Sequence, residues 1–340
     1  MRPHLPSLAA LALLAGALAC SSSNDSRRND GGAPAPDSGR SSGQEAPVPD
    51  RTACTGLTVG PGTYDWTVEH GGRTRAYRVH VPPGYDATRP APAVLAFHGF
   101  GSSEARMEAL TGLSTLADTE GFLAVYPRGL SQSELRGTSA ASQENQRGWN
   151  GGACCGRARD TVDDVGFVDA LLADLDRRVC VDTRRTFAMG FSNGGFFSYR
   201  LACERASRFA AIAPVAGTEG LSACKPSRPV PVLHVHGTAD SIIHYGGGNN
   251  LGPYGGDYPS AEESVRRWAK RNGCDGATVQ TYQQGDSTCV AHTGCVPESA
   301  TVSLCTVQEG EHTWPGANGG PPDLEATREA WRFFQARPRP

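Results

Sequence analysis

Hydrophobic and polar positions follow two periodicities along residues 54–340. Short, nearly continuous runs of apolar and β-branched residues predict strands that are buried on both faces, as in a parallel sheet. These predicted strands are 77–81, 93–97, 122–126, 186–191, 210–215, 230–235 and 300–307. Between them, apolar residues recur at helical spacing, as in 163–179 and in 264–271, which follows a capping box that starts at Ser260. A last helix is predicted after Asp323, which can cap it.

The alternation of these elements decides the fold class. Strand–helix–strand repeats favour an α/β fold, with a mostly parallel central sheet and helices on both faces. No internal repeat and no second linker interrupts the pattern after residue 54. We therefore predict one domain over residues 54–340.

Residues 1–53 show a different pattern. A short apolar run that ends at Ala19 is too short to span a bilayer and suits a signal peptide over residues 1–19. The run closes with Ala-Leu-Ala-Cys at Cys20, which resembles the lipobox of bacterial lipoproteins; plain Ala-x-Ala cleavage is the alternative. Residues 20–53 are rich in Ser, Gly and Pro without an aromatic residue, so we expect a disordered, lipoprotein-type tether. The protein is thus expected outside the cytoplasm, secreted or lipid-anchored at a bacterial cell envelope.

Composition narrows the function classes. The 32 basic and 35 acidic residues give a net charge of −3, which argues against a nucleic-acid partner that needs a basic face. Eleven cysteines are typical of an oxidising compartment. If Cys20 is acylated, an even number remains, and the sequence leaves their pairing open. We expect the adjacent Cys154 and Cys155 to join two different bridges. Four later cysteines are expected to staple the segment before residue 312, namely Cys274, Cys289, Cys295 and Cys305.

The clearest chemical motif is Gly-Phe-Ser-Asn-Gly-Gly at 190–195. It follows a predicted strand and precedes a predicted helix, which is the context of a G-x-S-x-G nucleophile elbow. The glycines leave room for a strained turn, on which Ser192 exposes its hydroxyl as a nucleophile. The backbone N–H of Asn193, at the start of the helix, then points at the oxyanion that develops on a substrate carbonyl. A Gly-Ser turn without function is the simpler alternative.

A second loop completes the predicted oxyanion hole. In hydrolases with this elbow, the loop after the third strand donates the second N–H group. Here His98-Gly99-Phe100 follows the predicted strand 93–97. We assign the donor to the Phe100 backbone N–H, with Gly99 permitting the turn, and expect His98 to support the loop rather than act as a base.

The other two triad members follow two further strands. Asp240 lies in the loop after 230–235, and His312 lies in the loop after 300–307. Carboxyl ends of parallel strands share one edge of a sheet, and Ser, Asp, His is the chain order of α/β hydrolases. His312 would accept the proton of Ser192, while Asp240 would orient the imidazole and stabilise its charged form.

The histidines before Asp240 allow a second interpretation. His234 and His236 share one face of the predicted strand, where they could ligate a metal. The sequence contains no Cys-x-x-Cys pair, and a metal site would leave the serine motif and His312 without a role. The glycine-rich stretch 246–256 lacks the Gly-Lys-Ser/Thr of a phosphate-binding loop. We therefore expect neither a metal nor another cofactor.

Several motifs occur together along most of residues 54–336. They are Arg-Ala-Tyr-Arg-Val-His-Val-Pro-Pro-Gly-Tyr at 75–85, His-Gly at 98–99, Tyr-Pro at 126–127, Trp-Asn-Gly-Gly-Ala-Cys-Cys-Gly at 149–156, Val-Asp-Asp-Val-Gly-Phe at 162–167, the elbow at 190–195, His-Gly-Thr-Ala-Asp at 236–240 and His-Thr-Trp-Pro-Gly at 312–316. As a set they resemble the extracellular polyhydroxybutyrate depolymerase and feruloyl or acetylxylan esterase group of α/β hydrolases. The resemblance implies the α/β-hydrolase fold and a secreted serine esterase without cofactor, whose triad is Ser192, Asp240 and His312. Phe100 departs from the family pattern, in which a small residue or Cys is common.

Two tryptophans lie in loops beside these motifs. Trp149 and Trp314 either line an apolar or aromatic acyl site or pack at the rim of the core, and the sequence leaves both interpretations open. Together with Phe100 they favour feruloyl-type esters, small or on oligosaccharides, over hydroxybutyrate polyester. A serine peptidase of the same fold and a non-catalytic surface lipoprotein are the alternative functions.

Overall fold

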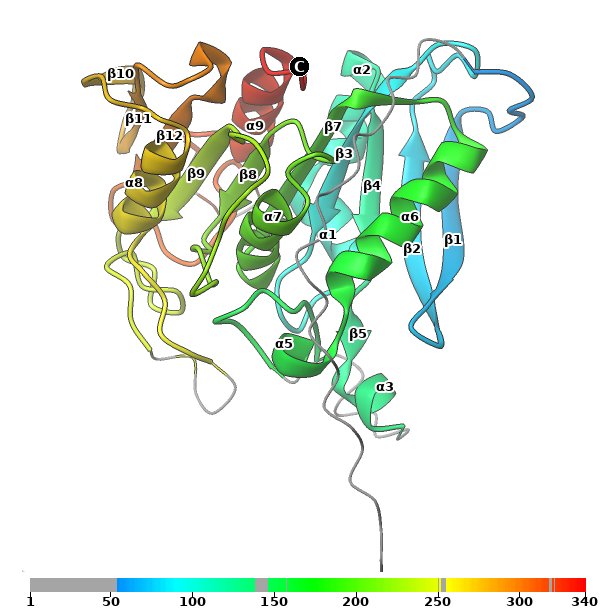
Figure 1. Cartoon of the computed structure of the whole chain (residues 1–340), viewed down its shortest axis with the longest axis horizontal. Helices are drawn as coiled ribbons and strands as arrows, with labels where there is room; N and C mark the ends of the chain where they lie inside the picture. Colours follow the sequence, from blue (N-terminus) through cyan, green and yellow to red (C-terminus); the bar gives the residue numbers. More distant parts are fainter. Residues whose placement is uncertain are drawn as a thin grey trace, which may run out of the picture. The chain divides into compact units, whose positions relative to one another are not determined.

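The computed structural model describes residues 54–137, 146–156, 158–249, 251, 255–317, 320 and 322–340. The predictions of a signal peptide, a tether and a lipidated Cys20 concern residues outside the described ranges. The described strands form a ten-stranded sheet in the order β1-β2-β4-β3-β7-β8-β9-β12-β11-β10 (Figure 1). They are β1 (Gly62–His70), β2 (Arg73–Val81), β3 (Ala91–Phe97), β4 (Leu123–Pro127), β7 (Val181–Phe191), β8 (Ile212–Val215), β9 (Val232–Gly237), β10 (Thr278–Gln284), β11 (Ser287–His292) and β12 (Val302–Val307). A separate ladder pairs β5 (Leu130–Ser131) with β6 (Arg147–Gly148).

The centre of the sheet is parallel and its edges are antiparallel. Strands β4, β3, β7, β8, β9 and β12 pair in parallel, which places their carboxyl ends at one edge of the sheet. The hairpin β1–β2 adds an antiparallel edge on one side, and β11–β10 adds another on the other side. All seven predicted strands are present, with ends shifted by a few residues.

In the large sheet, the strands that the sequence analysis missed are β1, β10 and β11, which form its two antiparallel margins. Strand β1 alternates between half-buried and exposed positions, so it carries no continuous apolar run. Its turn to β2 is made by Gly71 and Gly72, both at positive φ, as a two-residue hairpin requires. Strand β10 is exposed along nearly its whole length. Edge strands with one solvated face give a weak hydrophobic signal.

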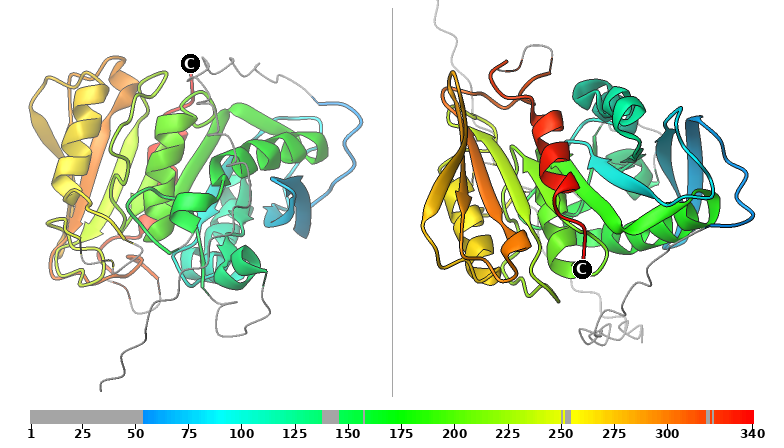
Figure 2. Two further views of the ribbon diagram at one scale, coloured as in Figure 1. Left: turned by 60° about the horizontal axis from the view of Figure 1, so that its bottom comes forward. Right: turned by 90° about the horizontal axis from the view of Figure 1, so that it is seen from above.

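Helices cover both faces of the sheet, as predicted (Figures 1 and 2). One face is packed by α6 (Asp164–Arg178), α7 (Asn193–Glu204) and α8 (Ala261–Arg271). The other is packed by α1 (Glu104–Thr111), α2 (Leu113–Glu120) and α9 (Ala326–Gln335). Two apolar cores therefore lie on either side of the parallel strands. Short helical turns occur at α3 (Gln132–Arg136), α5 (Ala158–Thr161) and η2 (Glu298–Ala300).

The predicted N-terminal cap is confirmed for α8 and wrong for α9. The Ser260 hydroxyl accepts from the Glu263 N–H at 2.9 Å and starts α8. The predicted cap of the last helix is wrong, because α9 begins at Ala326 with Glu325 as its N-cap residue. The Asp323 carboxylate instead accepts from the backbone N–H of Asp286 at 3.3 Å, in the turn between β10 and β11.

Ten cysteines form five disulfides. The bridges are Cys54–Cys180, Cys154–Cys155, Cys203–Cys224, Cys274–Cys295 and Cys289–Cys305. The last two hold the segment before residue 312, as expected. The expectation for Cys154 and Cys155 is wrong, since they pair with each other. Disulfides of this number are typical of an oxidising compartment.

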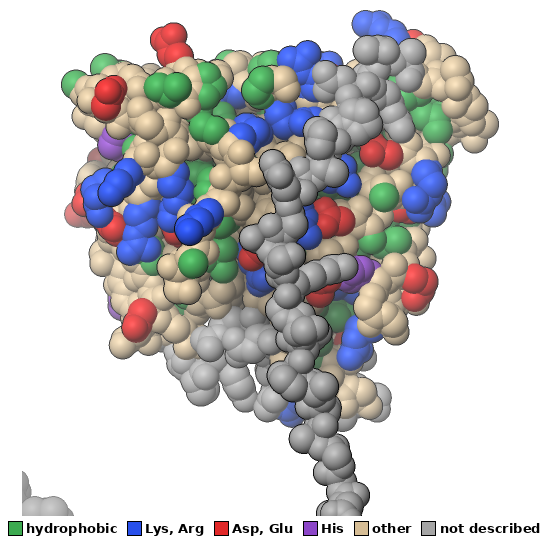
Figure 3. Space-filling view, viewed as in Figure 1, with side chains coloured by type: hydrophobic (Ala, Val, Ile, Leu, Met, Phe, Trp, Pro, Cys, Tyr) green, Lys and Arg blue, Asp and Glu red, His purple; other side chains and the backbone are tan. Residues whose placement is uncertain are grey.

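Two observations concern a membrane and charged partners. No helix among the described residues is long and apolar enough to cross a bilayer. Basic side chains gather over α8, at the left of the face in Figure 3. Arg266 and Arg267 of that helix pair with Glu263, and Arg271 pairs with Glu219. Ion pairs within the patch offset its charge.

Candidate active site

Ser192 sits on a sharp turn between β7 and α7. Its φ is 55°, a left-handed conformation that a residue other than Gly adopts rarely. A Cβ on Gly190 would overlap the backbone of Gly194, and a Cβ on Gly194 would overlap the carbonyl of Phe97. Only glycine fits at both positions, so the G-x-S-x-G pattern is required by the close approach of β3, β7 and α7.

Asp240 and His312 lie at the same edge of the sheet as Ser192. Asp240 follows β9 and His312 follows β12, and these two strands are parallel neighbours. The Nδ1 atom of His312 lies 2.8 Å from Oδ2 of Asp240. The Phe191 ring, next to Ser192, packs on the His312 ring with centroids 4.8 Å apart. The structure therefore brings the three predicted triad residues into one region.

The Asp240 carboxylate is saturated with donors. Its Oδ1 accepts from the backbone N–H groups of Ile242 at 2.9 Å and Ile243 at 2.8 Å. Its Oδ2 accepts from His312 and lies 3.3 Å from Nε2 of His236. Burial alone would raise the pKa of Asp240, but the hydrogen bonds from His236 and His312 outweigh it and hold the pKa far below its usual range. Asp240 is therefore a carboxylate at neutral pH, and His312 carries its proton on Nδ1.

The predicted oxyanion donors are the backbone N–H groups of Phe100 and Asn193. Neither donates a hydrogen bond to another residue in the described ranges. Gly99 lies against the serine, since a Cβ there would come within 3.3 Å of the Ser192 Cβ. Both N–H groups thus stay available beside Ser192, which fits the predicted role.

The side chain of Asn193 has a task that the sequence analysis missed. Its Oδ1 accepts from the Trp149 N–H at 2.7 Å. Its Nδ2 donates to the carbonyls of Trp149 at 3.1 Å and Cys154 at 2.9 Å. The residue after the nucleophile therefore fastens the loop with the Cys154–Cys155 bridge to the elbow. An Asn inside the G-x-S-x-G motif was the available signal.

The two tryptophans are buried. Trp149 is 0% exposed, and its Nε1–H donates to the His98 carbonyl at 3.0 Å. Trp314 is 2% exposed, and its Nε1–H donates to the Thr327 hydroxyl at 3.0 Å. Of the interpretations left open by the sequence, the structure favours packing at the core rim for both. Phe100, at 40% exposed, is the predicted aromatic residue that remains open to a ligand.

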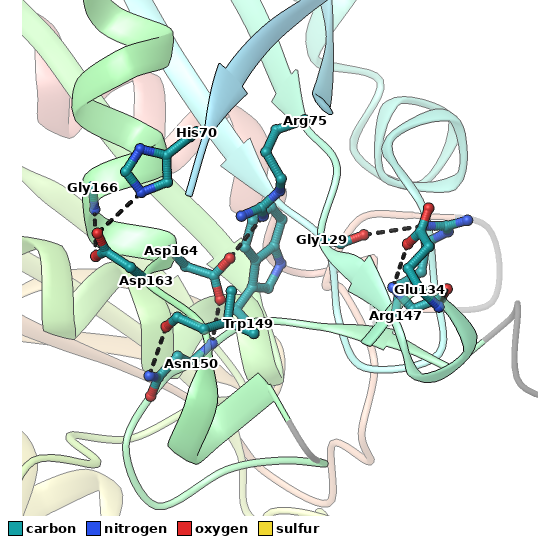
Figure 4. A network of polar contacts seen from close by, with 12 residues as sticks. His70, Arg75, Gly129, Glu134, Arg147, Trp149, Asn150, Asp163, Asp164 and Gly166 are labelled. Carbon is teal, nitrogen blue, oxygen red and sulfur yellow. Dashed lines mark hydrogen bonds and ion pairs between the residues drawn. The ribbon is translucent and has the colours of Figure 1, made fainter. Parts of the chain in front are cut away.

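A buried ion pair anchors the loop that carries Trp149 (Figure 4). Arg75 of β2 donates to Oδ1 of Asp164 at 2.7 Å, with side chains 2% and 0% exposed. The other oxygen of Asp164 accepts from the Asn150 N–H at 2.8 Å. The Asn150 amide in turn donates to the Val162 carbonyl at 2.9 Å. Asn150, the neighbour of Trp149, is thereby tied to Asp164 at the start of α6.

The metal interpretation of His234 and His236 does not fit their contacts. His234 bonds Tyr199 at 2.7 Å and His236 at 3.0 Å, and His236 also bonds the Ile243 carbonyl at 2.8 Å. Each ring nitrogen is thus engaged by a protein partner and presents no free lone pair to a metal. Within the described ranges, no group of three or more His, Cys, Asp or Glu side chains is arranged to hold a metal ion.

His98 is a buried structural histidine. Its Nδ1 donates to the Gly99 carbonyl at 2.8 Å, and its Nε2 accepts from the Gly129 N–H at 3.0 Å. Burial lowers the pKa of His98 to about 4, although the hydrogen bond to Gly99 opposes the shift. The neutral ring thus fits its two partners and holds the loop that contains Phe100.

This burial predicts a pH-dependent stability. An unfolded histidine titrates near ~6.5, so between about pH 6.5 and 4 the unfolded chain binds a proton that folded His98 rejects. The free energy of unfolding should fall by about 3 kcal/mol as the pH drops through this window, from this residue alone. Buried His234, whose pKa burial also lowers, adds to the slope.

Urea unfolding at stepped pH measures the effect. His98→Gln keeps an acceptor for the Gly129 N–H but does not titrate, so its stability should depend less steeply on pH than that of the wild type. The exposed His244→Gln is the matched control and should keep the wild-type slope. Equal slopes for wild type and His98→Gln would contradict the prediction.

Residues 69–301, more than half of the chain, match the family model described as "Putative esterase". The chain belongs to this esterase family. Membership confirms the resemblance drawn from the motifs and, with it, the class of carboxylic ester hydrolase.

Two relatives show how far the likeness extends. The esterase is 30% identical over 242 residues to feruloyl esterase B from Piromyces equi, which covers 69% of this chain but 42% of that relative. It is 29% identical over 282 residues to feruloyl esterase D from Neurospora crassa, which covers 79% of this chain and 84% of that relative. The chain thus spans less than half of the first relative and most of the second.

A solved structure supports the fold. Acetyl xylan esterase from Aspergillus awamori superimposes with a TM-score of 0.55, covering 81% of this chain and 99% of that one at 13% identity. At this identity the likeness concerns the fold alone. Together with the mostly parallel sheet, it confirms the predicted α/β-hydrolase fold of the esterase.

Proposed function

We propose that this esterase cleaves carboxylic esters through a Ser–His–Asp triad. Ser192 gives its hydroxyl proton to Nε2 of His312 as its oxygen attacks the ester carbonyl. The tetrahedral intermediate collapses to an acyl-enzyme, and His312 passes the proton to the leaving alkoxide. Water then gives a proton to His312 and attacks the acyl-enzyme. The second tetrahedral intermediate releases the acid, and His312 returns the proton to the departing Ser192 oxygen.

The main support is the His312–Asp240 hydrogen bond beside a serine at positive φ. Because Nδ1 of His312 donates to the carboxylate, Nε2 of the neutral ring is left as an acceptor for a hydroxyl proton. The Phe100 and Asn193 N–H groups are suited to stabilise the oxyanion, each removal of such a donor costing about 10²–10³-fold in known hydrolases.

The substrate that we propose is a feruloyl-type ester, free or on an oligosaccharide. The exposed Phe100 ring is seated on two glycines, since a Cβ on Gly148 would come within 2.9 Å of the ring and one on Gly156 within 2.5 Å. Phe100 belongs to the loop whose Gly99 lies against Ser192. A ring held in this loop suits stacking on an aromatic acyl group. The relatives named feruloyl esterase B and D agree with this class.

Initial rates on a panel of esters test the proposal. Methyl ferulate and a feruloylated oligosaccharide should be hydrolysed faster than hydroxybutyrate oligomers. Phe100→Ala should lower kcat/KM for methyl ferulate about fivefold, the value of one aromatic contact of about 1 kcal/mol. Methyl acetate is the internal control, because its acyl group has no ring to stack, and its rate should change little. Clearing of polyhydroxybutyrate without release of ferulate, or cleavage of peptide amides in place of esters, would contradict the proposal.

We further propose that the enzyme acts outside the cytoplasm, tethered through a lipid on Cys20. The support is the lipobox-like sequence before Cys20 and the Ser-, Gly- and Pro-rich stretch after it. The mature protein should partition into the detergent phase, and Cys20→Ser should release it or block its maturation. Intact mass of the native protein checks this, with an unlipidated N-terminus as the contradicting result.

A further inference from the structure

A chain of buried hydrogen bonds ends at the Asp240 carboxylate. His234 and His236 lie on the same face of β9, and Tyr199 faces them from α7. The Tyr199 hydroxyl lies 2.7 Å from Nδ1 of His234, whose Nε2 lies 3.0 Å from Nδ1 of His236. Nε2 of His236 lies 2.8 Å from the Ile243 carbonyl and 3.3 Å from Oδ2 of Asp240. All of these side chains are at most 4% exposed.

The Ile243 carbonyl sets the direction of every proton in the chain. A carbonyl can only accept, so Nε2 of His236 must carry a proton. In a neutral ring, Nδ1 of His236 is then an acceptor, which requires a proton on Nε2 of His234. Nδ1 of His234 is an acceptor by the same reasoning and takes the Tyr199 hydroxyl proton. The chain is satisfied with both rings neutral, and its last proton points at Ile243 and Asp240.

We propose that His236 is a positioning residue, which holds Asp240 in the orientation that receives His312. This inference rests on the proposed function and deepens it. The Nε2–H of His236 is shared between the Ile243 carbonyl at 2.8 Å and Oδ2 of Asp240 at 3.3 Å, and this Oδ2 also accepts from the Nδ1–H of His312. The carboxylate can then neither rotate nor present its other oxygen, which the Ile242 and Ile243 N–H groups already occupy.

The titratable groups that face His236 are His234, Tyr245 and Asp240. On β9 it stacks on His234 with ring centroids 5.3 Å apart, and the Tyr245 ring meets it edge-on at 5.8 Å. Asp240 is the anion that faces it, and His312 lies beyond that carboxylate. At the far end of the hydrogen-bond chain, Tyr199 interacts electrostatically with Glu219 and Arg271. These two residues form an ion pair with each other at 2.7 Å. Asp240 is therefore the anion that lies next to the Nε2–H group of His236.

Sharing of Oδ2 has a consequence for the base. With His236 in place, part of the negative charge on Oδ2 is taken up by a donor other than His312. Loss of that donor concentrates the charge toward His312 and stabilises its protonated form. It also leaves the carboxylate free to turn, and a misplaced orienting group lowers turnover more than substrate binding.

Two substitutions at residue 236 isolate the donor. The amide of His236→Asn reaches only as far as Nδ1 of the histidine, so it keeps an acceptor for His234 but cannot reach Asp240. The amide of His236→Gln reaches the position of Nε2 and restores a donor. For His236→Asn we expect kcat on methyl ferulate about tenfold lower, KM within about twofold, and the acid limb of the pH–rate profile about half a pH unit higher. For His236→Gln we expect most of kcat and the acid limb to return toward wild type.

Ser264→Ala is the control for general loosening. The Ser264 hydroxyl, on α8 and away from Asp240, is buried; it donates to the Ser260 carbonyl at 2.8 Å and accepts from the Glu219 N–H at 3.2 Å. It should lose thermal stability without a shift of the acid limb. The inference is overturned if His236→Asn keeps the wild-type kcat and acid limb, if His236→Gln behaves as His236→Asn, or if Ser264→Ala shifts the limb equally.

The same experiment separates this inference from the triad itself. Wild-type enzyme is labelled at Ser192 with a fluorophosphonate in each series, and the rate of labelling is followed against pH. In a wild type that labels at Ser192, an unchanged His236→Asn overturns the positioning role alone. The triad assignment would fail separately, through a wild type that hydrolyses esters while another residue carries the label.

Discussion

Ester hydrolysis by Ser192→Ala is expected to be about 10⁴- to 10⁶-fold slower than by the wild type, measured as kcat on methyl ferulate. The alanine removes the oxygen that forms the acyl-enzyme, while the turn between β7 and α7 keeps the glycines on which it depends. Covalent labelling by a fluorophosphonate should be lost at the same time. Mass spectrometry of the labelled wild type should locate the modification on Ser192.

The control for this prediction is a serine outside the site. Ser222 is exposed, so Ser222→Ala should keep wild-type activity and labelling. Thermal unfolding should show that the Ser192→Ala variant is folded. The Ser192 hydroxyl of the wild type makes no capping hydrogen bond at the start of α7, so its removal takes no such bond from the fold. A folded Ser192→Ala enzyme with undiminished ester hydrolysis would refute the triad.

Asp240→Asn is expected to lower kcat about 10⁴-fold at neutral pH, as removal of the triad carboxylate does in other serine hydrolases. The physical reason is specific to this site. Both oxygens of Asp240 face donors, from Ile242 and Ile243 on one side and from His236 and His312 on the other. Whichever way the amide turns, its NH₂ group meets donors.

This conflict also predicts a loss of stability. A buried donor without an acceptor costs about 1–3 kcal/mol, so Asp240→Asn should unfold at lower urea concentration than the wild type. Asp286→Asn, at the exposed turn between β10 and β11, is the matched control and should change neither turnover nor stability. A stable Asp240→Asn enzyme with turnover within tenfold of wild type would show that Asp240 does not orient the base.

Acid also acts on Asp240. Because the folded-state pKa of its carboxyl is depressed below the unfolded value, its hydrogen bonds stabilise the fold above the unfolded pKa, near ~3.9. This contribution is lost only as the pH falls from there toward the folded value. Asp240 therefore adds to acid unfolding below about pH 4, whereas His98 and His234 act at higher pH.

Local sequence was sufficient for the elements and residue types that depend on local chemistry. Continuous apolar runs predicted the parallel strands, because a strand buried on both faces can carry few polar residues. The spacing of Gly190, Ser192 and Gly194 predicted the elbow, because two glycines are needed where backbones meet. The positions of Ser192, Asp240 and His312 directly after predicted parallel strands predicted that they meet at one edge of the sheet, and the structure joins the latter two by a hydrogen bond.

Tertiary structure alone decided which side chains face a ligand and which face one another. Trp149 sits beside a catalytic motif in the sequence, yet its indole lies inside the core, since the loop folds back over His98. Cys154 and Cys155 likewise pair with each other, in a loop whose Cys154 carbonyl accepts from the Asn193 amide. Periodicity shows that a side chain is apolar or shares a face with another, but not what packs against it.

The histidines of β9 show this limit most clearly. Their alternate spacing placed His234 and His236 on one face of a strand, and that face suited a metal as well as a hydrogen-bond chain. The hydrogen-bond chain forms because Tyr199, on a helix 35 residues earlier in the chain, bonds His234. At the other end, the Ile243 carbonyl in the loop after β9 bonds His236. A hydrogen-bond partner is a matter of distance and direction in space, and only the packing of α7 and that loop against the sheet determines either.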